Sequence, residues 1–175
     1  MSSLVKKVQS LVRDVPDFPK KGILFKDITP ILRDGATFDR VIATMEAYAQ
    51  NRGADVIAGI ESRGFIFGAA LAARMDLGFV PIRKHGKLPW KTVKQTYDLE
   101  YGKDTVEIHK DAVDKKQRVL IVDDLFATGG TLSGACKLVQ KVGGVVAGCA
   151  CVIELSFLNG RKRLKGQDLF AIVKY

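Results

Sequence analysis

Short, mainly apolar runs alternate along this chain with longer segments that are apolar on one face only. The mainly apolar runs predict strands that are buried on both faces, and they cover residues 55–60, 78–82, 118–122, 145–155 and 169–175. Apolar residues at helical spacing predict helices at 3–13, 37–50, 65–75 and 132–142. Strands that alternate with helices in this way predict an α/β fold, in which helices cover both faces of a mainly parallel sheet.

Two segments depart from this alternation. Residues 15–30, VPDFPKKGILFKDITP, are interrupted by prolines and a glycine, so we expect irregular structure there. The runs QTYDLEY and TVEIH alternate on either side of Gly102-Lys103-Asp104, which predicts an antiparallel β-hairpin. The stretch from 83 to 101 is long for a connection in a compact domain, and we expect a lid over about residues 83–104.

Length and composition indicate one domain. The chain has 175 residues, of which 47% are hydrophobic and 27% charged, and no apolar run approaches the ~20 residues that a membrane span needs. Charges interrupt the N-terminal segment, so we expect no secretory signal. Cys149 and Cys151 would share one face of a buried strand, as thiols do in a reducing, cytoplasmic protein. The net charge of +9 fits a nucleic acid, an acidic membrane surface or a small polyanionic substrate.

The most informative stretch is VLIVDDLFATGGT, residues 119–131. After the apolar strand, the small residues Ala127, Thr128, Gly129, Gly130 and Thr131 let backbone N–H groups converge at a helix N-terminus, which is a favourable socket for a phosphate dianion. The hydroxyls of the two threonines add donors.

Asp123 and Asp124 precede that socket and need partners other than a phosphate. An ionised carboxylate only accepts hydrogen bonds, so hydroxyl groups are its natural ligands. A ribose 5-phosphate offers a phosphate to the turn and a vicinal diol to the aspartates. The alternative is a simple helix cap, which one aspartate would satisfy. Neither a GxxxxGK[ST] loop nor a GxGxxG motif is present, which argues against a nucleoside triphosphatase or a dinucleotide enzyme.

The same stretch resembles the phosphoribosyl-pyrophosphate signature of the type I phosphoribosyltransferases. Further segments, namely PDFPKKGILFKDITP, GIESRGFIFG, IRKHGKLP and YDLEYGKDTVEIHKDA, resemble the adenine-specific branch of that family. The resemblance implies the family fold, with a small hood formed mainly by residues 1–34. It also implies the reaction of adenine with 5-phosphoribosyl 1-pyrophosphate to give AMP and pyrophosphate, with Mg²⁺ as cofactor.

That reaction needs cations for an anionic leaving group. Ser62 and Arg63 follow one strand, and Arg83, Lys84 and Lys87 follow the strand that ends at Ile82, so we expect these five residues to bind pyrophosphate. Their alternative role is a solvated charged surface. We interpret the basic run at 160–166 as such a surface.

The resemblance also implies positions for the base, the metal and the proton. Adenine would stack on Phe25 and be read by the main chain of Ile23 and by Arg63, although Phe25 could equally be a plain core residue. Glu100 would act as general acid/base at N7, and Tyr101 would lie beside it in the lid. Since Mg²⁺ keeps several waters, Asp123 and Asp124 could hold it through water.

The resemblance further implies a homodimer in which Arg83 approaches the partner's site. We expect no nucleic acid and no membrane among the partners, because the fifteen residues before the first motif leave little room for a DNA-reading element. Two alternatives stay open: a non-catalytic regulator that binds phosphoribosyl pyrophosphate, and a transferase for another nucleobase.

Overall fold

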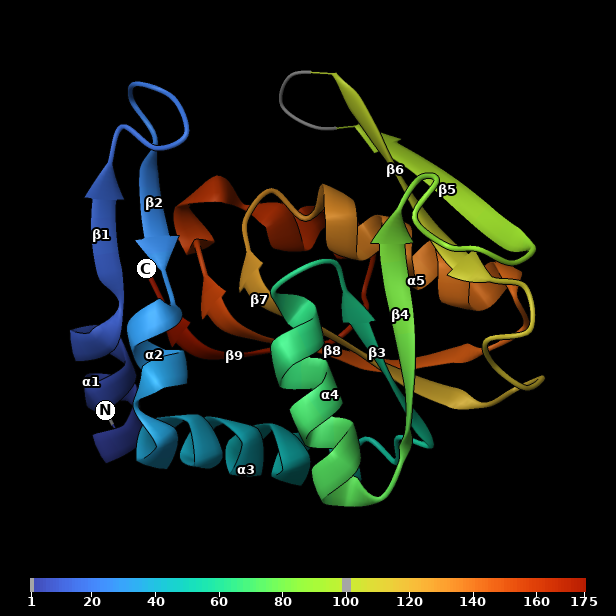
Figure 1. Cartoon of the computed structure of the whole chain (residues 1–175), viewed down its shortest axis with the longest axis horizontal. Helices are drawn as coiled ribbons and strands as arrows, with labels where there is room; N and C mark the ends of the chain where they lie inside the picture. The colour runs from blue at the N-terminus through green and yellow to red at the C-terminus, as the bar shows by residue number, and fades with distance from the viewer. Residues whose placement is uncertain (1, 99–101) are drawn as a thin grey trace.

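The computed structural model describes residues 2–98 and 102–175, in which a seven-stranded sheet lies between two layers of helices (Figure 1). The strand order is β5-β6-β4-β3-β7-β8-β9. The strands are β3 (Val56–Ile60), β4 (Gly78–Lys84), β5 (Thr92–Asp98), β6 (Lys103–His109), β7 (Arg118–Phe126), β8 (Val145–Glu154) and β9 (Leu169–Lys174). Five of them are parallel, and the hairpin β5–β6 pairs antiparallel with the edge of β4. The predicted α/β fold and the predicted hairpin are thereby confirmed.

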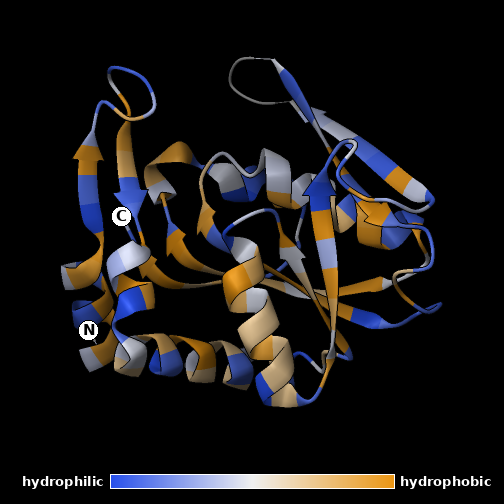
Figure 2. Ribbon diagram, in the orientation of Figure 1, coloured by the Kyte–Doolittle hydropathy of each residue, from blue (hydrophilic) through white to orange (hydrophobic). Residues whose placement is uncertain are grey.

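Helices cover the two faces of the sheet unequally. One face packs against α1 (Ser3–Leu11), α2 (Thr29–Arg33), α3 (Gly35–Asn51) and α4 (Gly64–Met75), and the other packs against α5 (Gly130–Lys141). Each face has its own apolar core, because alternate side chains of the strands point to opposite sides. Cys149 and Cys151 both belong to the core on the α5 side, as the spacing predicted. Figure 2 shows apolar residues along β8 and β9 and more polar ones along the outer strand β5.

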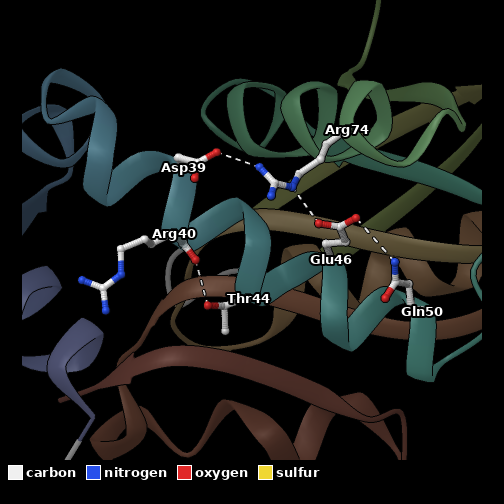
Figure 3. Close-up of polar contacts among 6 residues, drawn as sticks. All are labelled: Asp39, Arg40, Thr44, Glu46, Gln50 and Arg74. Carbon is white, nitrogen blue, oxygen red and sulfur yellow. Dashed lines mark hydrogen bonds and ion pairs between the residues drawn. The ribbon is translucent and has the colours of Figure 1, made fainter.

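A polar network ties α4 to α3 at the end of α4 that lies farthest from the carboxyl ends of the strands. Arg74 contacts Asp39 and Glu46, with 2.6 Å between nitrogen and oxygen in each case (Figure 3). Within α3, Gln50 donates to Glu46 over 3.4 Å, and the hydroxyl of Thr44 donates to a main-chain carbonyl. These groups are largely exposed, so they contribute little to the free energy of unfolding.

The structure corrects the prediction for residues 15–30. Two short strands, β1 (Arg13–Pro16) and β2 (Leu24–Asp27), form a separate antiparallel sheet in which Val15 lies opposite Phe25. Each strand has four residues, too few for a clear alternation, and the prolines and the glycine fall outside the paired positions except for Pro16 at a strand end. Local backbone pairing, which leaves no hydropathy pattern, decides the structure here.

A second correction concerns the strand before the amide-rich turn. We expected this strand to end at Val122, but β7 continues to Phe126 because β8 continues beside it and pairs Phe126 with Glu154. Asp123 and Asp124 therefore lie within a strand and not in the turn. Their backbones are fixed by the sheet, which holds the carboxylates more rigidly than a loop would.

No helix in the described part of the chain is long and apolar enough to cross a membrane. The hood and the lid stay predictions. Of the expected lid, residues 83–84, 92–98 and 103–104 belong to the strands β4, β5 and β6.

Candidate active site

A cavity of about 520 Å³ opens at the carboxyl ends of β3, β4 and β7, where ligands bind in sheets of this kind. In Figure 1 the hairpins β1–β2 and β5–β6 rise on either side of this edge of the sheet. The cavity is lined by residues at or just beyond the carboxyl ends of these strands, by residues of the hairpin β5–β6 and by one residue of α5, namely Ile60, Glu61, Ser62, Arg63, Lys84, Tyr97, Asp104, Val106, Asp123, Asp124, Leu125 and Thr131.

The two adjacent aspartates form one wall. The main-chain N–H of Asp124 donates to Oδ1 of Asp123 over 2.9 Å, and Nε of Arg63 lies 3.0 Å from Oδ2 of Asp124. Asp124 is 4% exposed. Burial, followed by the repulsion from Asp124, raises the pKa of Asp123 well above its usual value, and burial likewise raises the pKa of Asp124 against the opposing effect of Arg63. The wall therefore favours a ligand that brings hydrogen-bond donors or positive charge.

Beside this wall, residues 127–131, here called the amide loop, line a second cavity of about 200 Å³ together with Asp123, Leu125, Phe126 and Leu132. The loop leads directly into α5, whose N-cap is Gly129 with φ +83°, a conformation that favours glycine. No side chain of the described residues caps this helix, so its first N–H groups are left for a ligand. The reading of the aspartates as a simple helix cap is therefore wrong.

The predicted pyrophosphate-binding residues divide into two groups. Ser62, Arg63 and Lys84 line the large cavity. Arg83 lies outside that lining: its Nε and Nη2 contact the carboxylate of Glu61 at 3.2 and 3.1 Å, and its Nη1 donates to the main-chain carbonyl of Lys87. Hydrogen bonding from Arg83 lowers the pKa of Glu61. The side chain of Lys87 is exposed and also lies outside the cavity lining.

The hairpin β1–β2 places an aromatic ring near the aspartate wall. The guanidinium of Arg63 lies 4.9 Å from the ring centroid of Phe25, and Phe18 meets the same ring edge-on at 5.1 Å. Phe25 is partly exposed and belongs to neither apolar core, so the reading of it as a plain core residue is wrong. Ile23 is 44% exposed at the turn of the hairpin. Arg63 thus connects the ring to the acidic pair.

Comparison with known proteins agrees with this arrangement. The phosphoribosyl transferase domain matches residues 28–171. An adenine phosphoribosyltransferase of Roseiflexus castenholzii is 53% identical over 94% of this chain and 96% of its own length. The chain belongs to the adenine phosphoribosyltransferase family. This result confirms the resemblance drawn from the motifs, and with it the transferase class.

Solved structures of adenine phosphoribosyltransferases have the same fold. That of Thermoanaerobacter pseudethanolicus superposes with a TM-score of 0.95 at 51% identity and covers 98% of this chain and 99% of its own. That of Saccharomyces cerevisiae, complexed with an imino-altritol bisphosphate and adenine, has a TM-score of 0.93 at 38% identity, with 99% and 100% covered. The predicted type I phosphoribosyltransferase fold is confirmed.

Sequence reasoning overlooked Tyr97, which joins the hairpin to the amide loop. The hydroxyl of Thr131 donates to the hydroxyl oxygen of Tyr97 over 3.2 Å, and the Tyr97 hydroxyl donates to Asp104 over 3.3 Å. A Cβ on Gly134 would lie 2.9 Å from the Tyr97 ring, so only glycine fits beneath that ring without a shift. Strand alternation could have placed Tyr97 on the side of α5, but only the sheet order brings it to Thr131. Glu100 and Tyr101 lie outside the described residues.

The acidic wall can be tested as a site for Mg²⁺ of the kind that this family's chemistry implies. Among residues 2–98 and 102–175, no three histidine, cysteine or acidic side chains gather to form a dedicated metal site. Asp123 and Asp124 supply carboxylate oxygens at the cavity, and Mg²⁺ binds through one or two carboxylates while substrate oxygens and waters complete its shell. The residues present fit a metal that arrives with its substrate.

Proposed function

We propose that this chain transfers the 5-phosphoribosyl group of phosphoribosyl pyrophosphate to adenine, which yields AMP and pyrophosphate. The observation that supports this most strongly is the position of the acidic wall directly beside the uncapped amide loop. One polyanionic sugar can satisfy both features, because it carries a phosphate and a diol on the same ring. In the reaction, the bond between ribose C1 and pyrophosphate breaks, N9 of adenine forms a bond to C1, and the N9 proton is released.

Among the portions of the substrate, the ribose 5-phosphate is the one whose proposed binding position the described residues support best. The 5-phosphate would accept hydrogen bonds from the N–H groups of residues 127–131 and from the hydroxyls of Thr128 and Thr131. The 2- and 3-hydroxyls would donate to Asp123 and Asp124. Burial is the main cause that raises the pKa values of both carboxyl groups, and donors that stabilise the ionised form would offset it. Fixing the sugar at both ends holds C1 in place for the incoming base.

Pyrophosphate would lie towards Ser62, Arg63 and Lys84, which line the same cavity. Positive charge there stabilises the charge that develops on the leaving oxygen. Arg83 and Lys87 stay candidates for this role. For Arg83 to reach the ligand, its contacts with Glu61 would have to open.

Adenine would stack on Phe25, with the main chain of Ile23 and the guanidinium of Arg63 at its 6-amino edge. A carbonyl in place of the amino group would leave buried partners unpaired, and such mismatches are discriminated strongly. Glu100 would exchange a proton with N7 as the new bond forms, and Tyr101 would close over it with the lid. Replacing Glu100 by glutamine should lower kcat and leave nucleotide affinity largely unchanged.

Mg²⁺ bound with the substrate would neutralise part of the pyrophosphate charge, with Asp123 and Asp124 as its protein ligands through water. We also propose that the chain works in the cytoplasm as a homodimer, as the family resemblance implies. The position of Arg83 outside the cavity lining supports the proposal that it approaches the partner's site. Light scattering of the purified protein tests the dimer.

The decisive experiment is chromatography of nucleotides after the protein has been mixed with adenine, phosphoribosyl pyrophosphate and Mg²⁺. AMP should form with adenine, and hypoxanthine or guanine should react at least ~100-fold more slowly. Nucleotide formation from another base instead of adenine would change the substrate assignment. If binding of phosphoribosyl pyrophosphate occurs with no product from any base, the regulator alternative replaces the enzyme.

A further inference from the structure

A loop that has no assigned role in the proposed reaction packs directly against the amide loop. Residues 155–164, here called the bracing loop, follow β8 and contain two 3₁₀ turns, Ser156–Leu158 and Gly160–Leu164. A Cβ on Gly160 would lie 2.2 Å from the carbonyl oxygen of Ala127 and 3.0 Å from the nitrogen of Gly129. A Cβ on Gly129 would lie 2.5 Å from the carbonyl oxygen of Gly160. The two backbones are therefore in direct contact, with no room for a side chain on either glycine.

One buried ion pair holds the bracing loop in this position. Nε and Nη2 of Arg161 lie 2.6 and 2.7 Å from the two carboxylate oxygens of Glu154. Glu154 is 3% exposed, and Lys174 on β9 lies 3.7 Å from its Oε2. The basic run at 160–166 is thus only partly a solvated surface, because Gly160 is buried and Arg161 has a buried partner. A bidentate arginine–carboxylate pair fixes direction as well as distance.

The ion pair and the amide loop both adjoin the end of the paired strands β7 and β8. Glu154 lies opposite Phe126, the last residue of β7 before the amide loop. The N–H of Leu155 donates to the carbonyl of Phe126 over 2.8 Å, at the point where both loops leave the sheet. From this base the amide loop reaches α5, and the bracing loop returns to touch it at Gly160. Each loop therefore limits where the other can lie.

We infer that Gly160, Arg161 and Glu154 are positioning residues that hold the amide loop in its phosphate-binding conformation. This inference rests on the proposed function, because it assigns the 5-phosphate to the amide loop. Gly160 touches the amide loop directly, and the ion pair of Arg161 with Glu154 acts on that loop through Gly160. A cradle of N–H groups binds a phosphate well only when the groups point to one place before the ligand arrives. Loosening the bracing loop should therefore lower the affinity for every ligand that has the 5-phosphate and leave the affinity for ligands without it unchanged.

The test compares the dissociation constants of AMP and adenosine for the variants R161Q and R161K by titration calorimetry. For R161Q we expect AMP to bind about 10- to 100-fold more weakly, with adenosine affinity changed less than about twofold. R161K, which keeps the charge without the bidentate geometry, should lie between R161Q and the wild type. The steady-state KM for phosphoribosyl pyrophosphate should rise in parallel, whereas kcat and the KM for adenine change little.

R74Q is the matched control, because Arg74, like Arg161, donates to two carboxylate oxygens, but these belong to Asp39 and Glu46 on α3, away from the site. It should leave both dissociation constants unchanged. The inference is overturned if the ratio of the AMP and adenosine dissociation constants is the same in R161Q as in the wild type, whether both constants stay unchanged or both rise equally. Should R161Q fail to fold, the same comparison in R161K decides. Failure of the wild type to bind AMP would instead refute the proposed function, so the two failures are distinguishable.

Discussion

Two neighbouring strands carry buried carboxylates in opposite electrostatic settings. On β7, burial raises the pKa values of Asp123 and Asp124, and Arg63 compensates only in part. On β8, the hydrogen bonds from Arg161 lower the pKa of Glu154. Both oxygens of the carboxylate on β8 accept hydrogen bonds from Arg161, whereas the pair on β7 is only partly satisfied within the described residues.

The difference between the two strands shows that the chain keeps an electrostatically unfavourable pair of carboxylates on β7, at the candidate site. Within the described residues, Oδ2 of Asp124 accepts no hydrogen bond, although Arg63 lies 3.0 Å away as an ion partner. Buried polar atoms without hydrogen bonds are rare and concentrate at functional sites. The satisfied carboxylate of Glu154 stabilises the fold, whereas the partly satisfied pair of Asp123 and Asp124 is left able to accept hydrogen bonds from a ligand.

The largest effect should follow from replacing both Asp123 and Asp124 by asparagine. Affinity for phosphoribosyl pyrophosphate should fall at least ~100-fold, because charge-assisted hydrogen bonds to two hydroxyls are lost. At the same time the Tm at pH 7 should rise, because neutral amides replace two carboxyl groups whose ionised form is disfavoured by burial. In a domain of this size, ~1 kcal/mol of stability corresponds to roughly 2–4 °C in Tm. Isothermal calorimetry and thermal unfolding measure the two quantities.

The pH dependence of that stability gain follows from the raised pKa values. A carboxyl group whose pKa is higher in the folded state favours folding while it is protonated and loses that advantage as the pH rises. The gain should therefore grow as the pH rises and disappear below about pH 3, where the unfolded chain is protonated too. A double variant that is less stable than the wild type at pH 7 would contradict the account of β7.

The opposite result is expected for Glu154→Gln. Removing one member of a buried pair leaves its partner uncompensated, which costs 3–5 kcal/mol in fully buried cases. We expect a loss of about 1–3 kcal/mol in the free energy of unfolding, because the side chain of Arg161 is 44% exposed and solvent screens it. Because the pKa of Glu154 is lowered in the folded state, this loss should be present above about pH 4.3 and shrink as the pH falls. Urea unfolding at several pH values measures it.

A third, smaller effect is expected for Phe25, which would contact the base and contributes to neither apolar core. Phe25→Ala should raise the KM for adenine about tenfold, since a stacked ring contributes roughly 1–2 kcal/mol. The KM for phosphoribosyl pyrophosphate and the Tm should change little, because the ring is partly exposed and lies outside both cores. Steady-state kinetics with each substrate varied in turn gives the answer. Equal changes in both KM values would place Phe25 outside the base site.

The smallest effect should be that of Arg74→Gln. Its contacts with Asp39 and Glu46 are as short as the shorter contact of Arg161, at 2.6 Å, but these two carboxylates are 65% and 23% exposed, against 3% for Glu154. Ion pairs that solvent reaches contribute ~0–1 kcal/mol. Urea unfolding should show a loss within that range. A loss as large as that of Glu154→Gln would mean that burial does not distinguish the two ion pairs.

Much of the fold could be predicted from the sequence because its signals are local. The runs at 55–60 and 145–155 are apolar except for Asp55 and Glu154 near their ends, so they fit a buried strand whatever surrounds them. The hairpin β1–β2 gave no such signal, since four-residue strands are decided by pairing. The extension of β7 to Phe126 also depends on a partner, the strand β8, that is distant in sequence.

The candidate site shows the same division. Asp123 and the amide loop could be predicted because one short motif contains both chemistries. Tyr97 and Arg161 could not, because a lone tyrosine in a hairpin and an arginine in a basic run resemble ordinary surface residues. Their roles come from the contacts with Thr131 and Glu154, which only the packed fold brings within reach.

The most direct test of the account is a crystal structure of this chain with AMP bound. We predict that the phosphate receives hydrogen bonds from the main-chain N–H groups of residues 127–131, while the ribose hydroxyls donate to Asp123 and Asp124. A complex in which the phosphate lies elsewhere and the amide loop contacts no part of the nucleotide would contradict it.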